Sequence, residues 1–182
     1  MRIITGSRRG RKLQSLPGND VRPTADRVKE SLFNILQFRL EGRSFLDLYA
    51  GSGQIGLEAL SRGAKRAVFV DNRRASQEVI RGNIKITGFE DSAQLVSSDA
   101  AVYLKSPGET FDIAFLDPPY YAGELETVLE LTAARVKDTG IIICEHPENV
   151  ELPGGFGRFR KQKSYRYGKI YLTAYEIPGN GE

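Results

Sequence analysis

The stretch Phe45-Leu46-Asp47-Leu48-Tyr49-Ala50-Gly51-Ser52-Gly53-Gln54-Ile55-Gly56-Leu57-Glu58-Ala59-Leu60 decides the fold of this chain. Its apolar first part is typical of a buried strand, and the glycine pattern predicts a turn into a helix. We assign Gly51 to a tight turn, Gly53 to close approach of a ligand and Gly56 to close packing of helix on strand. Such a turn directs unpaired N–H groups at a ligand, although similar turns also join strands to helices without one.

Strands and helices alternate after this turn, which predicts a parallel sheet covered on both faces. We expect strands at 44–49, 66–70, 93–97, 111–116 and 139–144, and helices at 54–62, 73–86, 100–105 and 122–137. Short hairpins are expected at both ends of the chain, over 2–13 and 160–175, with a helix over 24–38. We divide the chain into an N-terminal extension, 1–42, and an α/β domain, 43–182.

Length and composition indicate one compact domain with a substantial core, because 40% of the 182 residues are hydrophobic. The single cysteine, Cys144, excludes an internal disulfide. No run of about 18 apolar residues occurs, and residues 1–6 lack the apolar stretch of a signal peptide. We therefore expect a cytoplasmic protein, monomeric and without a membrane partner.

Positive charge is concentrated in two segments, although the net charge is only +3. Residues 1–29 hold eight Lys or Arg against two Asp, and residues 158–169 hold six Lys or Arg and no acid. Two basic segments on an acidic body favour a polyanionic partner, and the aromatic residues of the second segment can stack on bases. Solvated arginine-rich loops are the alternative. The candidate nucleic-acid contacts are Arg8, Arg9, Arg11, Lys12, Arg22, Arg27, Arg166 and Lys169.

Acidic residues lie at the ends of the predicted strands, where open α/β sheets bind their ligands. Asp71 follows the second strand at the spacing at which an acid binds ribose hydroxyls, and Asp99 can accept a hydrogen bond from an adenine amine. Both residues are alternatively helix caps. Asp47, inside the first strand, requires a polar partner, and a bound ammonium group would supply one.

The fourth predicted strand, 111–116, runs directly into Asp117-Pro118-Pro119-Tyr120. Two prolines stiffen this turn and leave its carbonyls outside any strand ladder. An amine placed here can donate one hydrogen to the Asp117 carboxylate and another to the Pro118 carbonyl, while Tyr120 offers a flat face to the attached ring. These groups argue against a nicotinamide cofactor and favour methylation of the exocyclic amine of a base. A paired base must first be flipped out, and stacking on Tyr120 would offset part of the cost.

The same residues carry a resemblance to a known family. Arg22-Pro23-Thr24 with Leu32-Phe33-Asn34, the glycine turn, Gly56-Leu57-Glu58-Ala59-Leu60-Ser61-Arg62-Gly63-Ala64 and the Asp-Pro-Pro-Tyr turn resemble the RsmD-type methyltransferases, which contain Asp-Pro-Pro-Tyr and use S-adenosylmethionine. The resemblance covers nearly the whole chain. It implies a class I Rossmann-like fold whose seven-stranded, mostly parallel sheet has an antiparallel last strand.

The resemblance also implies an activity and its residues. The reaction would be methylation of a guanine N2 amine in 16S ribosomal RNA, with that RNA or the assembling small subunit as partner. The cofactor residues would be Asp47, Gly51, Ser52, Gly53, Asp71, Asn72, Asp99 and Ala100. The target base would lie against Asp117, Pro118, Pro119 and Tyr120. The roles of Arg22, Arg27 and Glu30 stay open.

Other functions remain possible from the sequence. An enzyme that methylates an adenine or cytosine amine in another RNA or in DNA would use a similar pocket. A nucleotide-binding module or a non-catalytic RNA-binding protein would not require the Asp-Pro-Pro-Tyr turn. Cys144 and His146 lie close together, but a metal site needs more ligands, so we expect no metal.

Overall fold

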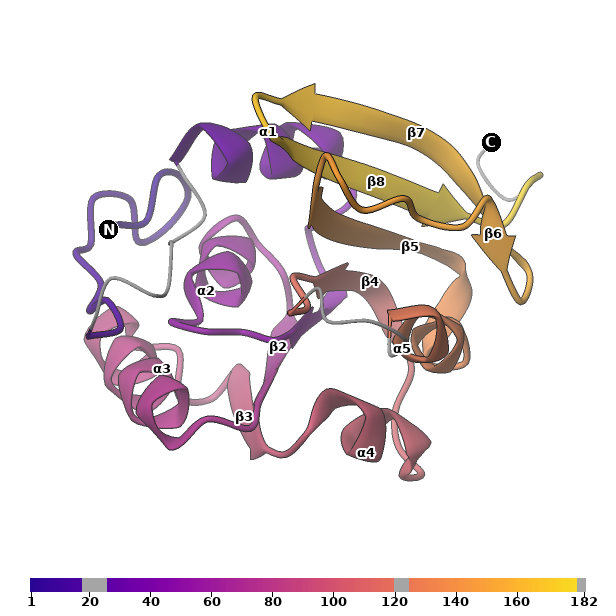
Figure 1. Cartoon of the computed structure of the whole chain (residues 1–182). Helices are drawn as coiled ribbons and strands as arrows, with labels where there is room; N and C mark the ends of the chain where they lie inside the picture. Colours follow the sequence, from indigo (N-terminus) through magenta and orange to yellow (C-terminus); the bar gives the residue numbers. More distant parts are fainter. Residues whose placement is uncertain (18–25, 120–124, 180–182) are drawn as a thin grey trace.

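A computed structural model describes residues 1–17, 26–119 and 125–179. These residues form one sheet with the strand order β3-β2-β1-β4-β5-β8-β7-β6 (Figure 1). The parallel strands are β1 (Ser44–Leu48), β2 (Arg66–Asp71), β3 (Ala93–Ser97), β4 (Phe111–Leu116) and β5 (Val136–Pro147). Antiparallel pairing begins at β8 (Ile170–Glu176), which is followed by β7 (Phe159–Tyr167) and β6 (Gly155–Phe156). The mostly parallel sheet is confirmed, and the two-residue β6 brings the described strands to eight instead of seven.

Helices cover both faces of the sheet (Figure 1). One face carries α1 (Asp26–Ile35), α2 (Gln54–Ser61) and α3 (Arg74–Thr87), whose buried residues share one hydrophobic cluster. The other face carries α4 (Ala100–Lys105) and α5 (Leu125–Ala133), which belong to a second cluster. Strands covered on both sides are apolar almost throughout, so the alternation of a half-exposed strand is missing from β2 and β4.

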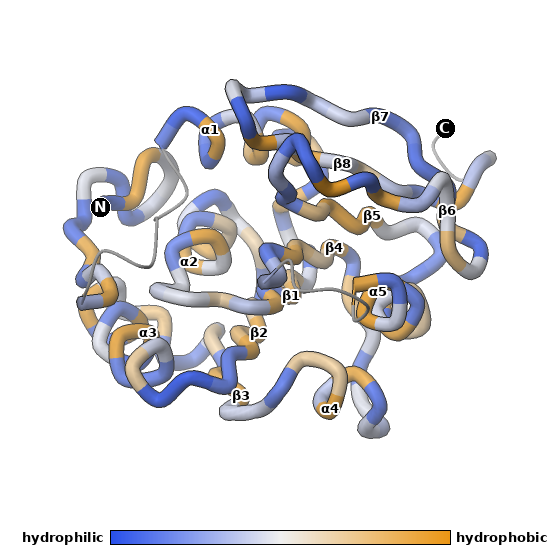
Figure 2. Tube along the Cα trace, in the orientation of Figure 1, coloured by the Kyte–Doolittle hydropathy of each residue, from blue (hydrophilic) through white to orange (hydrophobic). Residues whose placement is uncertain are grey.

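Hydropathy separates the central strands from the C-terminal hairpin (Figure 2). The tube of β4 is largely orange and that of β5 is orange in its middle part, whereas β7 is blue and white along most of its length. Most β7 residues are exposed, since no helix covers their outer side. The second basic segment of the sequence therefore lies on an open surface.

Most predicted elements agree with the structure within a few residues, but the region between α5 and β5 does not. The prediction continued a helix to residue 137, whereas α5 ends at Ala133 and β5 begins at Val136. Val136 pairs with Phe111 at the start of β4, and Phe111 donates its N–H to the carbonyl of Arg135 at 2.8 Å. Pairing with β4 outweighs the helical spacing of the apolar residues, so placing Val136 on a helix face was wrong.

The N-terminal segment is a hairpin that packs on the α2 and α3 side of the molecule. Arg2 and Lys12 form an isolated antiparallel bridge, and Ile3 donates its N–H to the carbonyl of Arg11 at 3.0 Å. Ile3 and Leu13 are buried in the hydrophobic cluster that α1, α2 and α3 share. We call residues 1–14 the N-terminal hairpin.

The sheet has two ends with different roles. The strands β1 to β4 are each followed by a helix, and they end at what we call the carboxyl edge; each of these helices returns the chain to the opposite amino edge. At the amino edge, Gly42 donates its N–H to the carbonyl of Gly63 beyond α2, at 2.9 Å. The glycine turn, residues 49–53, lies at the carboxyl edge between β1 and α2.

Candidate active site

The carboxyl edge brings together acidic residues that are far apart in the sequence. Leu48 in β1 pairs with Val70 on one side and with Leu116 on the other. Asp71 and Asp117 each come one residue after these partners. Because neighbouring strands lie about 4.8 Å apart, the two backbones flank the end of β1 at about 10 Å from each other. The predicted ribose acid and the predicted catalytic acid thus face the same turn.

The glycine turn has a left-handed backbone at three positions. The φ angles are 60° at Tyr49, 59° at Gly51 and 76° at Gly53. Glycine adopts this conformation without steric cost, whereas tyrosine is strained there, and such strain concentrates at functional sites. Gly53 closes the turn by donating its N–H to the carbonyl of Ala50 at 2.7 Å.

Each glycine of the pattern has a different environment. A Cβ on Gly56 would lie 2.3 Å from the Phe69 ring, which confirms that this glycine allows α2 to pack closely on β2. A Cβ on Gly53 would also meet Phe69, at 3.4 Å, and Ile80 at 3.3 Å. Gly51 has open space, with the nearest atom a main-chain oxygen at 4.0 Å. The open side of the turn is therefore at Gly51.

Asp47 is buried beneath the turn. The N–H of Gly56 donates to its Oδ2 at 2.9 Å, so this carboxylate holds the first turn of α2. Burial raises the pKa of Asp47 well above its usual value; the hydrogen bond from Gly56 opposes this shift, and the charges of Asp117 and Asp71 add to it. A cationic ligand group at this position would stabilise the ionised form.

Asp71 holds the other side of the glycine turn. Its Oδ2 accepts the N–H of Gly51 and its Oδ1 accepts the N–H of Arg73, both at 2.9 Å. The Arg73 guanidinium makes a longer contact with Oδ1, at 3.5 Å. Asn72, between them, is exposed. Asp71 fixes the backbone of the turn with a carboxylate that is itself buried, and its contact with a ribose stays a prediction.

Asp99 is the N-cap of α4. Its Oδ1 accepts the N–H of Val102 at 3.1 Å, which confirms the capping alternative. Asp99 is exposed at the end of β3, and Ala100 behind it is buried. Capping leaves carboxylate lone pairs for a ligand amine, so an adenine contact stays a prediction.

The Asp-Pro-Pro turn follows the fully buried strand β4. Asp117 is half-buried, Pro118 is buried and Pro119 is exposed, while Tyr120 lies outside the described residues. Burial raises the pKa of Asp117 to about 6, and the positive charge of Arg73 acts in the opposite direction. Asp117 is consequently ionised at neutral pH and able to accept a hydrogen bond from an amine.

Arg8 of the first basic segment lies away from this turn. Arg8 donates its main-chain N–H to Ser61 Oγ at 2.9 Å and its Nε–H to the carbonyl of Thr87 at 2.7 Å, and its guanidinium covers the Phe89 ring. Ser61 and Thr87 end α2 and α3, so Arg8 lies at the amino edge, where a cation stabilises the C-terminus of α3. Among the other candidates, Arg9, Arg11, Lys12 and Arg27 are exposed, and Arg22 lies outside the described residues.

The second basic segment reaches the carboxyl edge. Pro147, the last residue of β5, pairs with Ile170, the first residue of β8. The turn between β7 and β8 therefore lies at the same edge as Asp117. Arg166 bonds Glu148 at 3.2 Å, and Lys169 is exposed. Both cations are at the edge where a polyanion would approach the candidate site.

Sequence reasoning missed a buried polar centre at Glu58 in α2. Its two oxygens accept the N–H groups of Ile4 and Thr5, at 2.8 and 2.9 Å, and the Nε–H of Arg62 at 2.8 Å. Lys29 lies 3.7 Å away, fully buried, and burial lowers its pKa although Glu58 opposes that shift. The signal available in the sequence was the position of Glu58 itself, a carboxylate flanked by apolar residues within a predicted helix. Glu58 fastens the N-terminal hairpin and α1 to α2.

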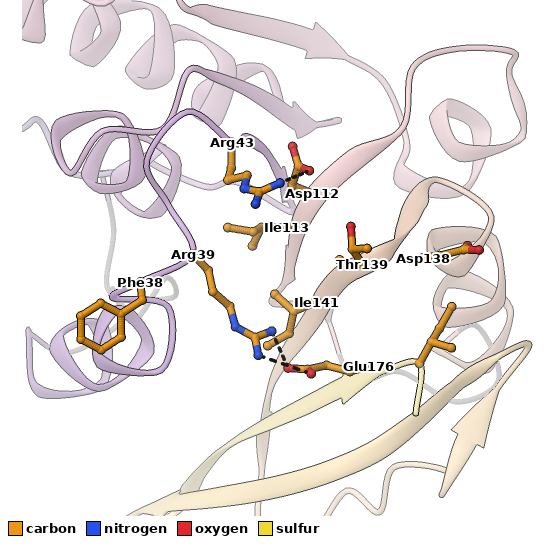
Figure 3. Close-up of a pocket in the computed structure, with 11 residues that line it drawn as sticks. Phe38, Arg39, Arg43, Asp112, Ile113, Asp138, Thr139, Ile141 and Glu176 are labelled. Atoms are coloured by element: carbon orange, nitrogen blue, oxygen red, sulfur yellow. Dashed lines mark hydrogen bonds and ion pairs between the residues drawn. The ribbon is translucent and has the colours of Figure 1, made fainter. Parts of the chain in front are cut away.

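A polar cavity of about 110 Å³ lies at the amino edge (Figure 3). Its charged residues bond one another: Arg39 contacts Glu176 at 2.6 Å and Arg43 contacts Asp112 at 3.4 Å. Phe38 points outward beside it and is 91% exposed. None of the predicted site residues that the structure describes lines this cavity, so it is separate from the described part of the candidate active site.

Neither a metal-binding cluster nor a membrane-spanning helix is found in the part of the chain that the structure describes. No three His, Cys, Asp or Glu residues there gather in a way that could hold a metal ion. Cys144 is buried, and His146 Nε2 lies 2.8 Å from Thr173 Oγ1. None of the described helices has the length and apolar character needed to span a bilayer.

The fold and this site define a class of protein. A parallel sheet extended by an antiparallel β8 next to β5, with a glycine turn after β1 and an acidic turn after β4, is the architecture of Rossmann-like methyltransferases. SMU.776, solved in complex with SAH, has a similar fold, with a TM-score of 0.69 over 83% of this chain and 48% of that chain, at 16% identity. That likeness concerns the fold alone.

The chain belongs to the family described as Conserved hypothetical protein 95, whose family model matches residues 1–176. YlbH of Bacillus subtilis (strain 168) is 38% identical over 98% of this chain and 100% of its own length. Ribosomal RNA small subunit methyltransferase D of Escherichia coli (strain K12) is 35% identical over 100% of this chain and 92% of its own. The structure of yhhF from Escherichia coli superposes with a TM-score of 0.84, at 35% identity and 97% coverage of both chains. The resemblance stated from the motifs is confirmed.

Proposed function

We propose that this chain transfers a methyl group from S-adenosylmethionine to the exocyclic N2 amine of a guanine in 16S ribosomal RNA. The observation that carries the proposal is the stiff Asp117-Pro118 turn, which lies beside the glycine turn at one edge of the sheet. The printed name of the Escherichia coli relative supports small-subunit ribosomal RNA as the substrate.

The residues around the glycine turn suit this cofactor. S-adenosylmethionine carries an ammonium group, a ribose and an adenine, and supplies a methyl group on a positively charged sulfur. Asp47 is a buried acid whose ionised form gains from a cation. Asp71 offers acceptors for ribose hydroxyls, and Asp99 offers one for the adenine amine. The open side at Gly51 leaves room for a ligand against the backbone.

The acidic turn suits an amine substrate. The lone pair of a base amine is delocalised into the ring, which makes it a weak nucleophile. Asp117 and the Pro118 carbonyl would each accept one N–H, direct the lone pair at the methyl group and hold it in line. The carboxylate also offsets the positive charge that develops on nitrogen during transfer. Asp117 need not remove the proton before attack.

Positive charge at the carboxyl edge suits an RNA backbone. Arg166 and Lys169 flank the edge from the β7–β8 turn, and Lys12 and Arg27 are exposed near the start of the chain. Phosphate contacts of this kind position the nucleic acid and make its affinity fall as salt concentration rises. Arg8, Arg9 and Arg11 would contact RNA only where it extends to the amino edge.

Transfer of labelled methyl from S-adenosylmethionine tests the proposal. The acceptors are small-subunit ribosomal RNA from cells that lack this protein, the same RNA in assembled subunits, and DNA. Label recovered as N2-methylguanosine from RNA alone is the expected result. Label in an adenine or cytosine of RNA or DNA would contradict the guanine assignment, and no label despite cofactor binding would contradict the substrate class.

A further inference from the structure

Asn83 of α3 connects two parts of the molecule that the sequence separates by about forty residues. Its side chain is completely buried. Both partners are main-chain groups: one belongs to Gln14 in the N-terminal hairpin and the other to Ser52 in the glycine turn. One carboxamide therefore bonds the hairpin and the turn at the same time.

The contacts of Asn83 use both ends of its carboxamide. Gln14 donates its N–H to Asn83 Oδ1 at 2.7 Å, and Asn83 Nδ2 donates back to the Gln14 carbonyl at 3.0 Å. The same nitrogen donates to the Ser52 carbonyl at 2.9 Å. With two donors and one acceptor engaged, the side chain is fixed in one orientation. Moving either main-chain segment would leave buried polar groups unpaired.

The surroundings of this link are also adapted to it. A Cβ on Gly82 would lie 2.6 Å from Gln14 Oε1, so the end of the flexible Gln14 side chain lies against α3 directly before Asn83. On the turn side, Ser52 Oγ lies 3.5 Å from Met1 Sδ, which gives a second contact between hairpin and turn. The hairpin thus packs directly against the turn that forms the candidate cofactor site.

We propose that Asn83 is a positioning residue that couples the N-terminal hairpin to the glycine turn, so that RNA bound by the hairpin strengthens cofactor binding in the turn. This inference rests on the proposed function. A ligand that further restrains the hairpin restrains the Ser52 carbonyl through Asn83, and a ligand in the turn restrains the hairpin in return. Coupling between binding sites is reciprocal by thermodynamic necessity.

Two substitutions break the hydrogen bonds between Asn83 and Gln14, one at each residue. Asn83→Ala removes all three hydrogen bonds. Gln14→Pro removes the N–H that bonds Asn83 Oδ1 and leaves the bond to Ser52 in place, so it remains informative if Asn83→Ala folds poorly. Gln14→Ala is the matched control, because the link uses only main-chain groups of residue 14.

The measurement is the affinity for S-adenosylhomocysteine by calorimetry, with and without saturating small-subunit ribosomal RNA. RNA is expected to tighten binding by about fivefold or more in the wild type and in Gln14→Ala, at the lower end of usual coupling factors. The factor should fall below about twofold in Gln14→Pro and Asn83→Ala, which is within the error of no coupling.

Equal factors in all four proteins, or no effect of RNA on the wild type, would overturn the inference. Methyl transfer to the same RNA by the wild type separates the two claims. If the wild type methylates the RNA but RNA changes the S-adenosylhomocysteine affinity equally in all four proteins, only the role of Asn83 is overturned. If the wild type does not methylate the RNA, the proposed function is overturned together with it.

Discussion

The main-chain N–H of Gly56 donates to Oδ2 of Asp47 across 2.9 Å in the interior of the protein. The same carboxylate therefore supports the N-terminus of α2 and remains a buried acid whose pKa is raised by burial and by the neighbouring acids. The stability of the fold and the binding of a ligand require different properties of the Asp47 side chain. A neutral hydrogen-bond acceptor satisfies Gly56, whereas a bound ammonium group requires the negative charge.

Substitution of Asp47 separates these two demands. Asp47→Ala should lower the free energy of unfolding by about 1–3 kcal/mol, because the buried N–H of Gly56 loses its acceptor. Asp47→Asn keeps an acceptor and removes a buried charge, so its stability should stay within about 1 kcal/mol of the wild type. Both variants should bind S-adenosylmethionine about tenfold more weakly, which corresponds to a lost charge-assisted hydrogen bond. Urea unfolding and calorimetry measure the two effects, and an Asp47→Asn variant with unchanged affinity would place the ammonium group elsewhere.

Gly56→Ala tests the packing of α2 on β2. The added Cβ would lie 2.3 Å from the Phe69 ring, so the helix must move. We expect a loss of about 1–3 kcal/mol in the free energy of unfolding, the usual cost of overpacking a core. Gly154→Ala is the matched control, because a Cβ there meets nothing within 4 Å. Equal unfolding midpoints for the two variants would show that the backbone absorbs the extra atom without cost.

Removal of Glu58 should detach the N-terminal hairpin from α2 and leave the buried ammonium group of Lys29 without its carboxylate. Glu58→Ala should cost about 3–5 kcal/mol, because Lys29 remains buried without its partner. Combining it with Lys29→Met should recover part of that loss, since the fully buried ammonium group is then removed as well. A double-mutant cycle in urea measures the coupling. Strictly additive losses would mean that Lys29 does not depend on Glu58.

The pH dependence of methyl transfer should report Asp117. Its pKa in the folded protein is raised to about 6, so the carboxylate that accepts the amine N–H is present above pH 6 and becomes protonated below it. Arg73 opposes the shift, and the charge of Asp117 in turn raises the pKa of Asp47 and Cys144. We expect kcat/KM to be constant at high pH and half-maximal near pH 6. An acid limb of the same midpoint in Asp117→Asn would assign it to another group.

The raised pKa also has a consequence for stability. The folded protein binds the Asp117 proton more tightly than the unfolded chain, so this carboxyl favours folding at low pH. That contribution is lost as pH rises through about 6. Asp117→Asn should therefore be at least as stable as the wild type at pH 8, measured by urea unfolding. A marked loss of stability would indicate that the carboxylate has a structural partner.

The arrangement of the sheet was predictable because its strands have a simple pattern. Apolar runs such as Ile113–Leu116 occur where both faces are covered, and the glycines mark the first turn. The boundary between α5 and β5 was not predictable, since Val136 fits the apolar spacing of a helix and the pairing with Phe111 is set by a distant strand. The two-residue β6 likewise depends on its pairing with β7.

The candidate site likewise contains residues that could be predicted from the sequence and contacts that could not. Asp71 and Asp117 were found because they directly follow apolar strands, and the topology brings the ends of those strands together. The hydrogen bond between Asp47 and Gly56 and the link from Asn83 to Gln14 were not found, because a sequence does not show which main-chain groups will lack partners. The internal use of Arg8 was missed for a related reason: its charge was visible, but the Thr87 carbonyl that it bonds was not.

The most direct test of the central claim is single-turnover methyl transfer at pH 8 by the wild type and Asp117→Asn, with S-adenosylhomocysteine affinity measured on both. Small-subunit ribosomal RNA is the acceptor, and the product is digested to nucleosides. The account predicts N2-methylguanosine from the wild type and a rate at least about a hundredfold lower in the variant, the usual cost of losing a group that stabilises the transition state. Cofactor affinity should stay within about twofold, since the proposal assigns Asp117 to the base and not to the cofactor. A variant that methylates at the wild-type rate would contradict the account.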